Sequence, residues 1–338
     1  MNLRRIYFIL TILWTCAACQ TAAQNSDNFP NPTTIQPSPR SVLVRQPTQT
    51  PRLIDSPMPA TSDPAALPSA TFTPASLPSA TLDPLIISQA LAATLPPLAQ
   101  TLPATFDPPG ATVIGYSAGG QPLTVQRFGS GARILLLIGG IHGGWEANTV
   151  TLMEQLIDHF TQTPGDVLPG VIIMIIPVAN PDGLAYGRIP RGRFNADGVD
   201  LNRNWSCEWS RDAFWRQDRV NPGLTSFSEP ESVALANFLL QVRPAAALFY
   251  HSAANGVFAG NCGGDHGSAA MSAVLGKAAG YSYDEPFTAY PVTGVASNWA
   301  DGQGIPSADV ELQTSTDSEY DRNLRGIMAL QHWIAAQS

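Results

Sequence analysis

Charge is scarce in this sequence of 338 residues: only 13% of its side chains are Asp, Glu, Lys or Arg, and the net charge at pH 7 is -8. A basic patch is missing as well, which argues against a nucleic-acid partner, because binding to phosphates needs clustered Lys and Arg. The apolar run near the N-terminus, from Ile6 to Thr15, is too short for a membrane-spanning helix. The length allows one large domain or two small ones.

The N-terminus has the features of a secretory signal. Arg4 and Arg5 precede the apolar run, and Cys16-Ala17-Ala18-Cys19 follows it. The small residues before Cys19 resemble a bacterial lipoprotein cleavage box, although Cys16 stands where leucine is usual. We therefore expect residues 1–19 to be a lipoprotein-type signal peptide, with simple cleavage as the alternative. Lipidation of Cys19 would place the protein on the outer face of the bacterial cytoplasmic membrane with no other membrane contact, and simple cleavage would secrete it.

Residues 20–109 are rich in Pro, Ser, Thr and Ala, and 18 of the 30 prolines lie between Thr21 and Pro109. Such a segment buries too little apolar surface to offset its ordering entropy, so we expect a disordered stalk. Residues 110–338 are then expected to form the folded domain. Beyond the signal only Cys207 and Cys262 remain. In an oxidising compartment we expect them to form a disulfide, the alternative being two unpaired thiols.

Three continuous apolar runs predict strands that are covered on both faces, namely Arg133–Ile138, Val171–Pro177 and Ala245–Tyr250. Apolar side chains at helical spacing predict one helix around Leu152, Met153, Leu156, Ile157 and Phe160, and another around Leu324, Ile327, Met328, Leu330 and Ile334. Ser228, with Pro230 and Glu231 after it, predicts a capping box that opens a third helix. The alternation of strands and helices predicts an α/β protein, an α/β/α sandwich around a mixed, mostly parallel sheet.

A histidine and a glutamate follow the first of these strands, in Gly139-Gly140-Ile141-His142-Gly143-Gly144-Trp145-Glu146. The carboxyl ends of strands are where open α/β sheets place their sites. His251 ends the third apolar run and is expected at the same edge. Two imidazoles and one carboxylate can hold a hydrolytic zinc while one position stays open for water. We therefore predict that His142, Glu146 and His251 bind one Zn2+.

Other motifs accompany these ligands: Asn180-Pro181-Asp182-Gly183, the run from Arg193 to Trp205, and Ala308-Asp309-Val310-Glu311-Leu312. Together they resemble the zinc metallocarboxypeptidases related to pancreatic carboxypeptidase A, and Asp200-Leu201-Asn202-Arg203-Asn204-Trp205 is the most specific part of the likeness. The family has two residues between its first histidine and glutamate, whereas Gly143, Gly144 and Trp145 intervene here. Paired glycines allow a bulge to absorb the extra residue. The arginine that some relatives carry in this turn is absent.

The resemblance implies roles for further residues. Glu311 would be the general base, Arg193 would stabilise the oxyanion, and Asp200 would accept a hydrogen bond from the first histidine. Four residues would bind substrate: Asn202 and Arg203 at its terminal carboxylate, Ser252 at its backbone, and Tyr290, nine residues before Trp299, as a cap. The implied reaction removes the C-terminal amino acid from a peptide with a free C-terminus.

Asp309, two residues before Glu311, shares a face with it if the segment is a strand. By the resemblance, the residue at this position lines the pocket of the departing side chain, where an acid would favour Lys, Arg or another amine-bearing residue, unless Asp309 pairs with an internal arginine. No motif includes His159, His266 or His332, which are expected to be structural. Trp145, Trp205 and Trp299 are expected to be packing residues.

Two other functions stay open. One is a zinc-dependent deacylase of the aspartoacylase and succinylglutamate desuccinylase type, which shares the metal set. The other is an inactive binding module, suggested by the altered spacing between His142 and Glu146. The run Asn202-Arg203-Asn204-Trp205 and Tyr290 favour the peptidase.

Overall fold

The computed structural model describes residues 110–337. The predicted signal peptide, Cys19 and the stalk lie outside the described residues. Within residues 110–337, no helix has the length and apolar composition needed to cross a membrane.

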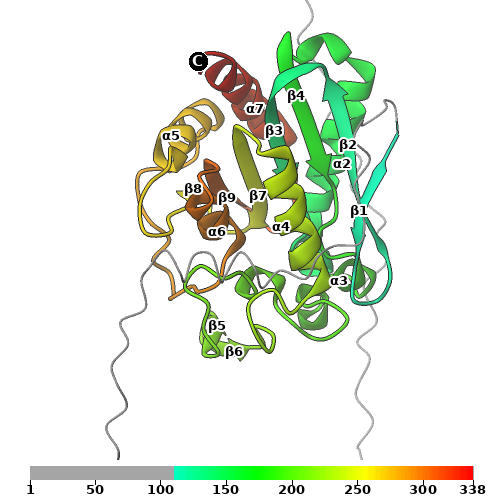
Figure 1. Ribbon diagram of the computed structural model, residues 1–338, viewed down its shortest axis with the longest axis vertical. Helices are drawn as coiled ribbons and strands as arrows, with labels where there is room; N and C mark the ends of the chain where they lie inside the picture. Colours follow the sequence, from blue (N-terminus) through cyan, green and yellow to red (C-terminus); the bar gives the residue numbers. More distant parts are fainter. Residues whose placement is uncertain (1–109, 338) are drawn as a thin grey trace, which may run out of the picture. The chain divides into compact units, whose positions relative to one another are not determined.

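A seven-stranded mixed sheet forms the centre of the domain (Figure 1). Its strands, in chain order, are β1 (Thr112–Tyr116), β2 (Pro122–Gly129), β3 (Gly131–Ile138), β4 (Gly170–Ile176), β7 (Ala246–Ser252), β8 (Gly256–Ala259) and β9 (Ser307–Leu312). In space the order is β1-β2-β4-β3-β7-β9-β8. The four central strands β4, β3, β7 and β9 are parallel, and β1, β2 and β8 join antiparallel at the two sides. The mixed, mostly parallel sheet predicted from the sequence is confirmed.

Helices cover both faces of the sheet, as the continuous apolar strands require. They are α2 (Ala147–Gln162), α3 (Pro181–Ala185), α4 (Pro230–Val242), α5 (Ser268–Ala279), α6 (Ala296–Gly302) and α7 (Tyr320–Ala335). Successive side chains of β3 point to opposite faces of the sheet and pack in two different hydrophobic cores. Leu136 and Ile138 pack with α4 and α6, whereas Leu135 and Leu137 pack with α2, α5 and α7. Both predicted helical stripes, in α2 and α7, face the second core.

The start of α4 differs from the prediction. Glu229, not Ser228, precedes the first helical residue, and no side chain caps the helix end. The Ser228 hydroxyl donates to Glu229 Oε1, and Glu231 accepts from the backbone N–H of Ala118 instead of turning back to the helix. The capping-box prediction was wrong because Glu231 holds the turn between β1 and β2.

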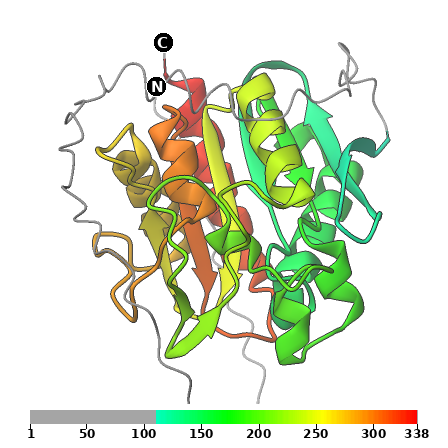
Figure 2. The same ribbon diagram turned by 60° about the horizontal axis from the view of Figure 1, so that its bottom comes forward.

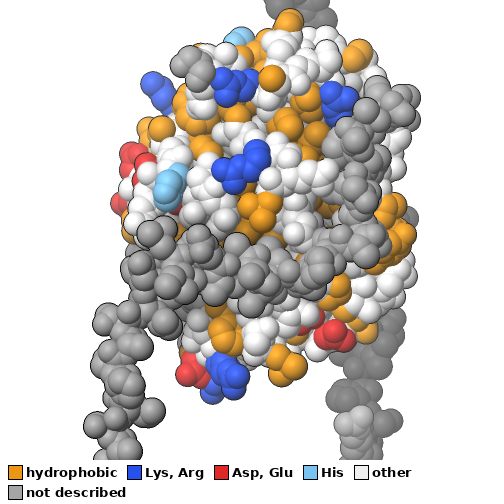
Figure 3. All heavy atoms as spheres, in the orientation of Figure 1, with side chains coloured by type: hydrophobic (Ala, Val, Ile, Leu, Met, Phe, Trp, Pro, Cys, Tyr) orange, Lys and Arg blue, Asp and Glu red, His pale blue; other side chains and the backbone are white. Residues whose placement is uncertain are grey.

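Shorter elements gather at the carboxyl ends of the parallel strands. The segment between α3 and α4 contains η3 (Pro190–Arg193), η4 (Leu201–Arg203) and a hairpin of β5 (Ala213–Trp215) and β6 (Asp218–Val220). Figure 2 brings this end forward and shows the segment lying across it. Cys207 in this segment and Cys262 after β8 are joined by a disulfide. On the face seen in Figure 3, basic side chains are scattered singly among apolar and neutral ones.

Candidate metal centre

His142 and Glu146 lie in one tight turn after β3. His142 directly precedes η1 (Gly143–Glu146), a single turn of 3-10 helix, and Glu146 is the last residue of that turn. His142 Nδ1 is 2.9 Å from Glu146 Oε1. The extra residue between His142 and Glu146 therefore lies in a turn of 3-10 helix and not in a bulge. The altered spacing still brings both side chains to the same point.

Glycine is required twice in this turn. Gly143 has φ +45, and a Cβ on it would lie 2.6 Å from the backbone carbon of Gly183. A Cβ on Gly144 would lie 2.5 Å from the carbonyl oxygen of Gly187. The paired glycines therefore let η1 pack directly against α3 and η3, which fixes the direction of both ligands.

The third ligand comes from the neighbouring strand. β3 and β7 are parallel, with Ile138 opposite Phe249, so His251 emerges from β7 at the edge where the η1 turn begins. His251 Nδ1 lies 3.3 Å from His142 Nδ1 and 3.3 Å from Glu146 Oε2. One ligand atom from each of the three residues lies within 4.8 Å of the other two. All three side chains are buried.

The chemistry of this set fits a bound cation. Two ring nitrogens and a carboxylate converge, and one positive ion can satisfy all of them at once. Burial by itself would raise the pKa of Glu146, but His142 and His251 hold that pKa below its ordinary value. Burial lowers the pKa of His251, whereas hydrogen bonds and charges from Asp309 and Glu146 raise it to about 10. Surroundings that favour a proton this strongly also favour a metal ion in its place.

Asp200 orients the first histidine from behind. Its Oδ1 lies 3.3 Å from His142 Nε2, and its Oδ2 accepts from Arg193 Nε at 2.8 Å. Burial would raise the pKa of Asp200, but Arg193 and then His142 hold it well below its usual range. The ionised carboxylate thus fixes the imidazole with Nδ1 toward the metal position.

Two hollows meet at the metal centre. Residues common to both are His142, Arg193, Phe287, Tyr290 and Glu311. The first, called here the Arg216 pocket, adds Trp145, Glu146, Trp215, Arg216, Gln217, Ser252, Ala253, Ala254 and Ala289. The second, the Arg203 pocket, adds Asn202, Arg203, His251, Phe258, Val292, Val295 and Asp309. A substrate bond at their junction would have one part in each pocket.

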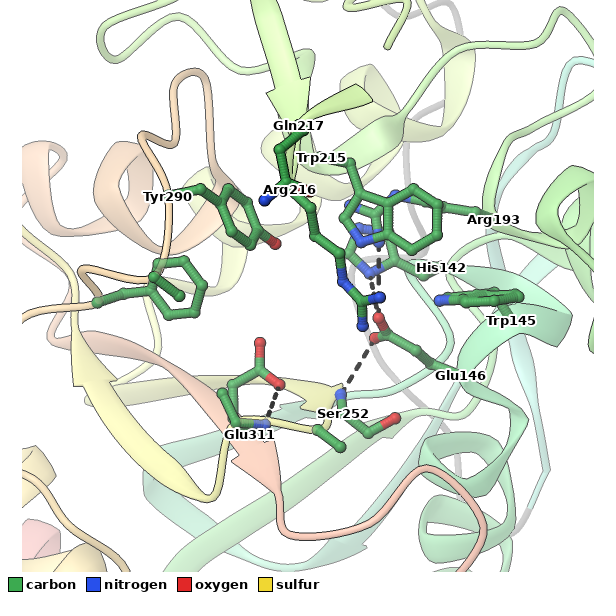
Figure 4. A pocket seen from close by; sticks show the side chains of 14 residues that line it. His142, Trp145, Glu146, Arg193, Trp215, Arg216, Gln217, Ser252, Tyr290 and Glu311 are labelled. Atoms are coloured by element: carbon green, nitrogen blue, oxygen red, sulfur yellow. Dashed lines mark hydrogen bonds and ion pairs between the residues drawn. The ribbon is translucent and has the colours of Figure 1, made fainter. Parts of the chain in front are cut away.

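Glu311 lies at this junction, at the end of β9. Its Oε2 accepts from the backbone N–H of Ala254 at 3.2 Å. Burial raises the pKa of Glu311 to about 7, with Glu146 and Asp309 adding to the rise and His251 opposing it. Figure 4 shows Glu311 facing Glu146 across the opening. A carboxyl group with this pKa can both accept and release a proton near neutral pH.

Arg203 and Asn202 form the floor of the Arg203 pocket. Arg203 is 2% exposed, and its Nε and Nη1 donate to the carbonyl oxygens of Phe214 and Asn202. Asn202 Oδ1 accepts from the backbone N–H of Ala296, and its Nδ2 lies 3.3 Å from His251 Nε2. Within residues 110–337, Arg203 takes part in no ion pair.

The remaining predicted substrate residues also lie here. Tyr290 lines both pockets and packs edge-on against Phe287 at 5.0 Å. Ser252 lines the Arg216 pocket, but its hydroxyl donates to Asn148 Oδ1. Among residues 110–337, Asp309 forms an ion pair with His251 and with no arginine. Its Oδ1 lies 3.5 Å from His251 Nε2, and it lines the Arg203 pocket.

One wall of the cleft was not predicted from the sequence. Trp215, Arg216 and Gln217 lie on a hairpin whose strands have three residues each, too short for a periodic signal. Trp145, expected to be a packing residue, packs edge-on against Trp215 at 5.2 Å, and its half-buried ring also lines the Arg216 pocket.

Several residues outside the cleft are structural, as expected. Trp205 and Trp299 pack together in the core at 5.1 Å. His159 pairs with Asp166, and His266 pairs with Asp301.

The parallel-centred α/β sheet holds two histidines and a glutamate at its carboxyl edge, and this arrangement can bind one metal ion. Residues 110–262 match the family model described as zinc carboxypeptidase. The description of that family model names zinc, and His142, Glu146 and His251 are positioned to hold one such ion.

Relatives agree with this assignment. The chain is 32% identical over 155 residues to murein peptide amidase A of Escherichia coli (strain K12), a match that spans 43% of this chain and 60% of the amidase. It is 32% identical over 112 residues to carboxypeptidase B of Astacus astacus, across 28% of this chain and 37% of the relative.

Solved structures show the same fold. Carboxypeptidase A from Helicoverpa armigera has a TM-score of 0.56 at 20% identity, covering 68% of this chain and 69% of that one. The murein-tripeptide amidase from Escherichia coli O157 has a TM-score of 0.51 at 21% identity, covering 70% and 95%.

Proposed function

We propose that this domain is a zinc-dependent hydrolase that removes the C-terminal residue of short peptides, with cell-wall peptides as the first class to test. The observation that carries the proposal is Arg203, a buried guanidinium in a pocket that opens onto the metal centre. Arginine stays charged in proteins, and a buried charge without an ionic partner is costly. A free carboxylate at the end of a substrate would supply that partner in paired hydrogen bonds.

The residues at the junction can then divide the work. His142, Glu146 and His251 would hold a zinc ion, which when bound would polarise the scissile carbonyl and make water a better nucleophile. Glu311 accepts the proton of the attacking water and passes it to the departing amine, which suits its raised pKa. Arg193, fixed through Nε by Asp200, presents its remaining N–H groups to the oxygen on which charge develops. Tyr290 covers the junction from the opposite side.

Two observations bear on the substrate. One relative is a murein peptide amidase by name, which supports a cell-wall peptide. The Arg216 pocket continues beyond the metal centre along Trp145, Trp215 and Ser252. This extension favours a peptide over the short acyl groups of an aspartoacylase-type substrate. Asp309 in the Arg203 pocket favours a departing residue that carries an amine.

Release of the last residue, followed by mass spectrometry, tests the proposal. The substrates are a murein tripeptide and peptides ending in Lys or Leu, each with a free or an amidated C-terminus. We expect hydrolysis of the free forms, Lys faster than Leu, and a loss on the order of a hundredfold in kcat/KM for Arg203→Gln. Arg219→Gln, on the exposed β6 strand, is the matched control. Equal cleavage of free and amidated peptides would contradict the carboxylate clamp.

A further inference from the structure

The β5–β6 hairpin places a second arginine over the cleft. Trp215 pairs with Asp218, so Arg216 and Gln217 form a two-residue turn. Arg216 has φ +59, in the left-handed region that turns of this length usually fill with glycine, asparagine or aspartate. The backbone therefore gives no reason for an arginine at this position.

The side chain of Arg216 has no ionic partner within the described part of the chain. It takes part in none of the ion pairs there, although Arg219 on the same hairpin pairs with Asp212. Its Cζ lies 5.4 Å from the centre of the Trp215 ring. In Figure 4 the side chain extends from the hairpin toward the space before Glu146 and Glu311.

Arg216 and two tryptophans make one continuous wall. Trp215 has the Arg193 guanidinium at 4.8 Å from its ring and packs edge-on against Trp145. Trp215 and Trp145 are both half-buried and line the Arg216 pocket. The wall thus offers an apolar surface that ends in a positive charge.

The other charged groups of this pocket already have roles. Glu146 belongs to the metal set, Arg193 is paired with Asp200, and Glu311 is the proposed base. Arg216 is the cation of this pocket that has no carboxylate partner among residues 110–337. With the departing residue in the Arg203 pocket, the residue that precedes the scissile bond lies beside this wall.

We propose that Arg216 is a specificity residue that binds a carboxylate on the substrate residue preceding the scissile amide. The inference rests on the proposed function for the direction in which the substrate lies. A guanidinium matches a carboxylate with paired N–H donors, and the methylene groups of an acidic residue would lie on Trp215 and Trp145. Arg216 and Arg203 would then each bind one carboxylate of the substrate, at the two ends of the cleft.

Two peptides that differ at one residue test this. Acetyl-Ala-Glu-Lys carries the carboxylate before the scissile bond, and acetyl-Ala-Gln-Lys carries the neutral amide of the same shape. We expect the wild-type protein to favour the Glu peptide about tenfold in kcat/KM, as for one exposed charge-assisted contact. Arg216→Gln should abolish the preference, Arg216→Lys should keep part of it, and Arg219→Gln should leave it unchanged.

Binding separates this inference from the proposed function. The same two peptides are titrated calorimetrically into the zinc-loaded Glu311→Gln protein. Tighter binding of the Glu peptide that Arg216→Gln removes, without hydrolysis by the wild type, would support Arg216 and refute the proposed reaction. Hydrolysis with no preference between the peptides, or a preference that survives Arg216→Gln, would refute the role of Arg216 and leave the reaction standing.

Discussion

Glu311 is the residue whose replacement separates chemistry from structure most cleanly. Glutamine has the same shape and keeps an acceptor for the Ala254 N–H, but it cannot take a proton from water. We predict that Glu311→Gln keeps its zinc and its melting temperature and loses about a hundredfold or more in turnover. Peptide release, zinc analysis and thermal unfolding measure the three properties. Glu154→Gln, on the exposed side of α2, should behave as wild type, and near-normal turnover by Glu311→Gln would mean that another group activates the water.

His251 contributes one of three ligands, so its loss should be visible in the metal itself. We predict that His251→Ala, purified in buffer with trace zinc, holds much less than one zinc per chain, because two protein ligands seldom retain the ion. His266→Ala is the matched control, since that half-exposed imidazole pairs with Asp301 away from the cleft. Elemental analysis decides, and equal zinc in both variants would disprove the ligand set.

Among individual residues, those whose place in the fold follows from a single sequence motif were predicted best. The ligand set follows from strand ends and could be predicted before the structure. Arg216 could not, because its place over the metal centre depends on how the segment between α3 and α4 crosses the sheet edge. Asp309 was predictable as a pocket residue, but its proximity to His251 depends on the register of β7 against β9.

At the scale of elements, α4 carries an unusual charge arrangement. Glu231 in its first turn is buried beside Asn195, and Glu229 and Asp182 are close to it. Burial raises the pKa of Glu231 from 4.5 to about 7, with Asp182 adding to the rise and the N–H of Ala118 and the Asn195 side chain opposing it. The folded protein therefore binds this proton more tightly than the unfolded chain does.

The sign of the pH effect follows from that difference. Between pH 4.5 and about 7, Glu231 holds more of its proton in the folded state than in the unfolded state, so its contribution to the free energy of unfolding falls as pH rises through this window. We predict that Glu231→Gln flattens this fall and is more stable than wild type at pH 8. Urea unfolding at several pH values measures it, with Glu154→Gln as the exposed control. An equal change with pH in wild type and in Glu231→Gln would contradict the assignment to Glu231.

Strands and helices marked by a long apolar run or stripe were predicted correctly. The capping box and the β5–β6 hairpin, which depend on only a few residues, were not. The apolar runs gave β3, β4 and β7, and the stripes gave α2 and α7. The capping box failed because Glu231 bonds to Ala118, which is 113 residues away along the chain. The strands of the β5–β6 hairpin have three residues each. The β propensity of so few residues is outweighed by their tertiary contacts, so the hairpin could not be predicted from the sequence.

For the whole molecule, attachment to a membrane remains a prediction from the sequence. If residues 1–19 are a lipoprotein signal, Cys19 carries the lipid and the protein fractionates with membranes. We predict that Cys19→Ser loses incorporation of labelled fatty acid and shifts to the soluble fraction. Cys16→Ser is the matched control and should keep both properties. Labelling that persists in Cys19→Ser would exclude this anchor.

The disulfide between Cys207 and Cys262 closes a ring within the part of the chain that the structure describes. It spans 55 residues, and a loop of that size stabilises a protein by about 4 kcal/mol in the chain-entropy model. The ring contains the exposed β5–β6 hairpin, which a protease reaches more easily than the sheet. A cut there would divide the zinc site, with His142 and Glu146 on one fragment and His251 on the other. Both fragments would stay covalently joined, so a nicked enzyme would keep its parts in register until a reductant separated them.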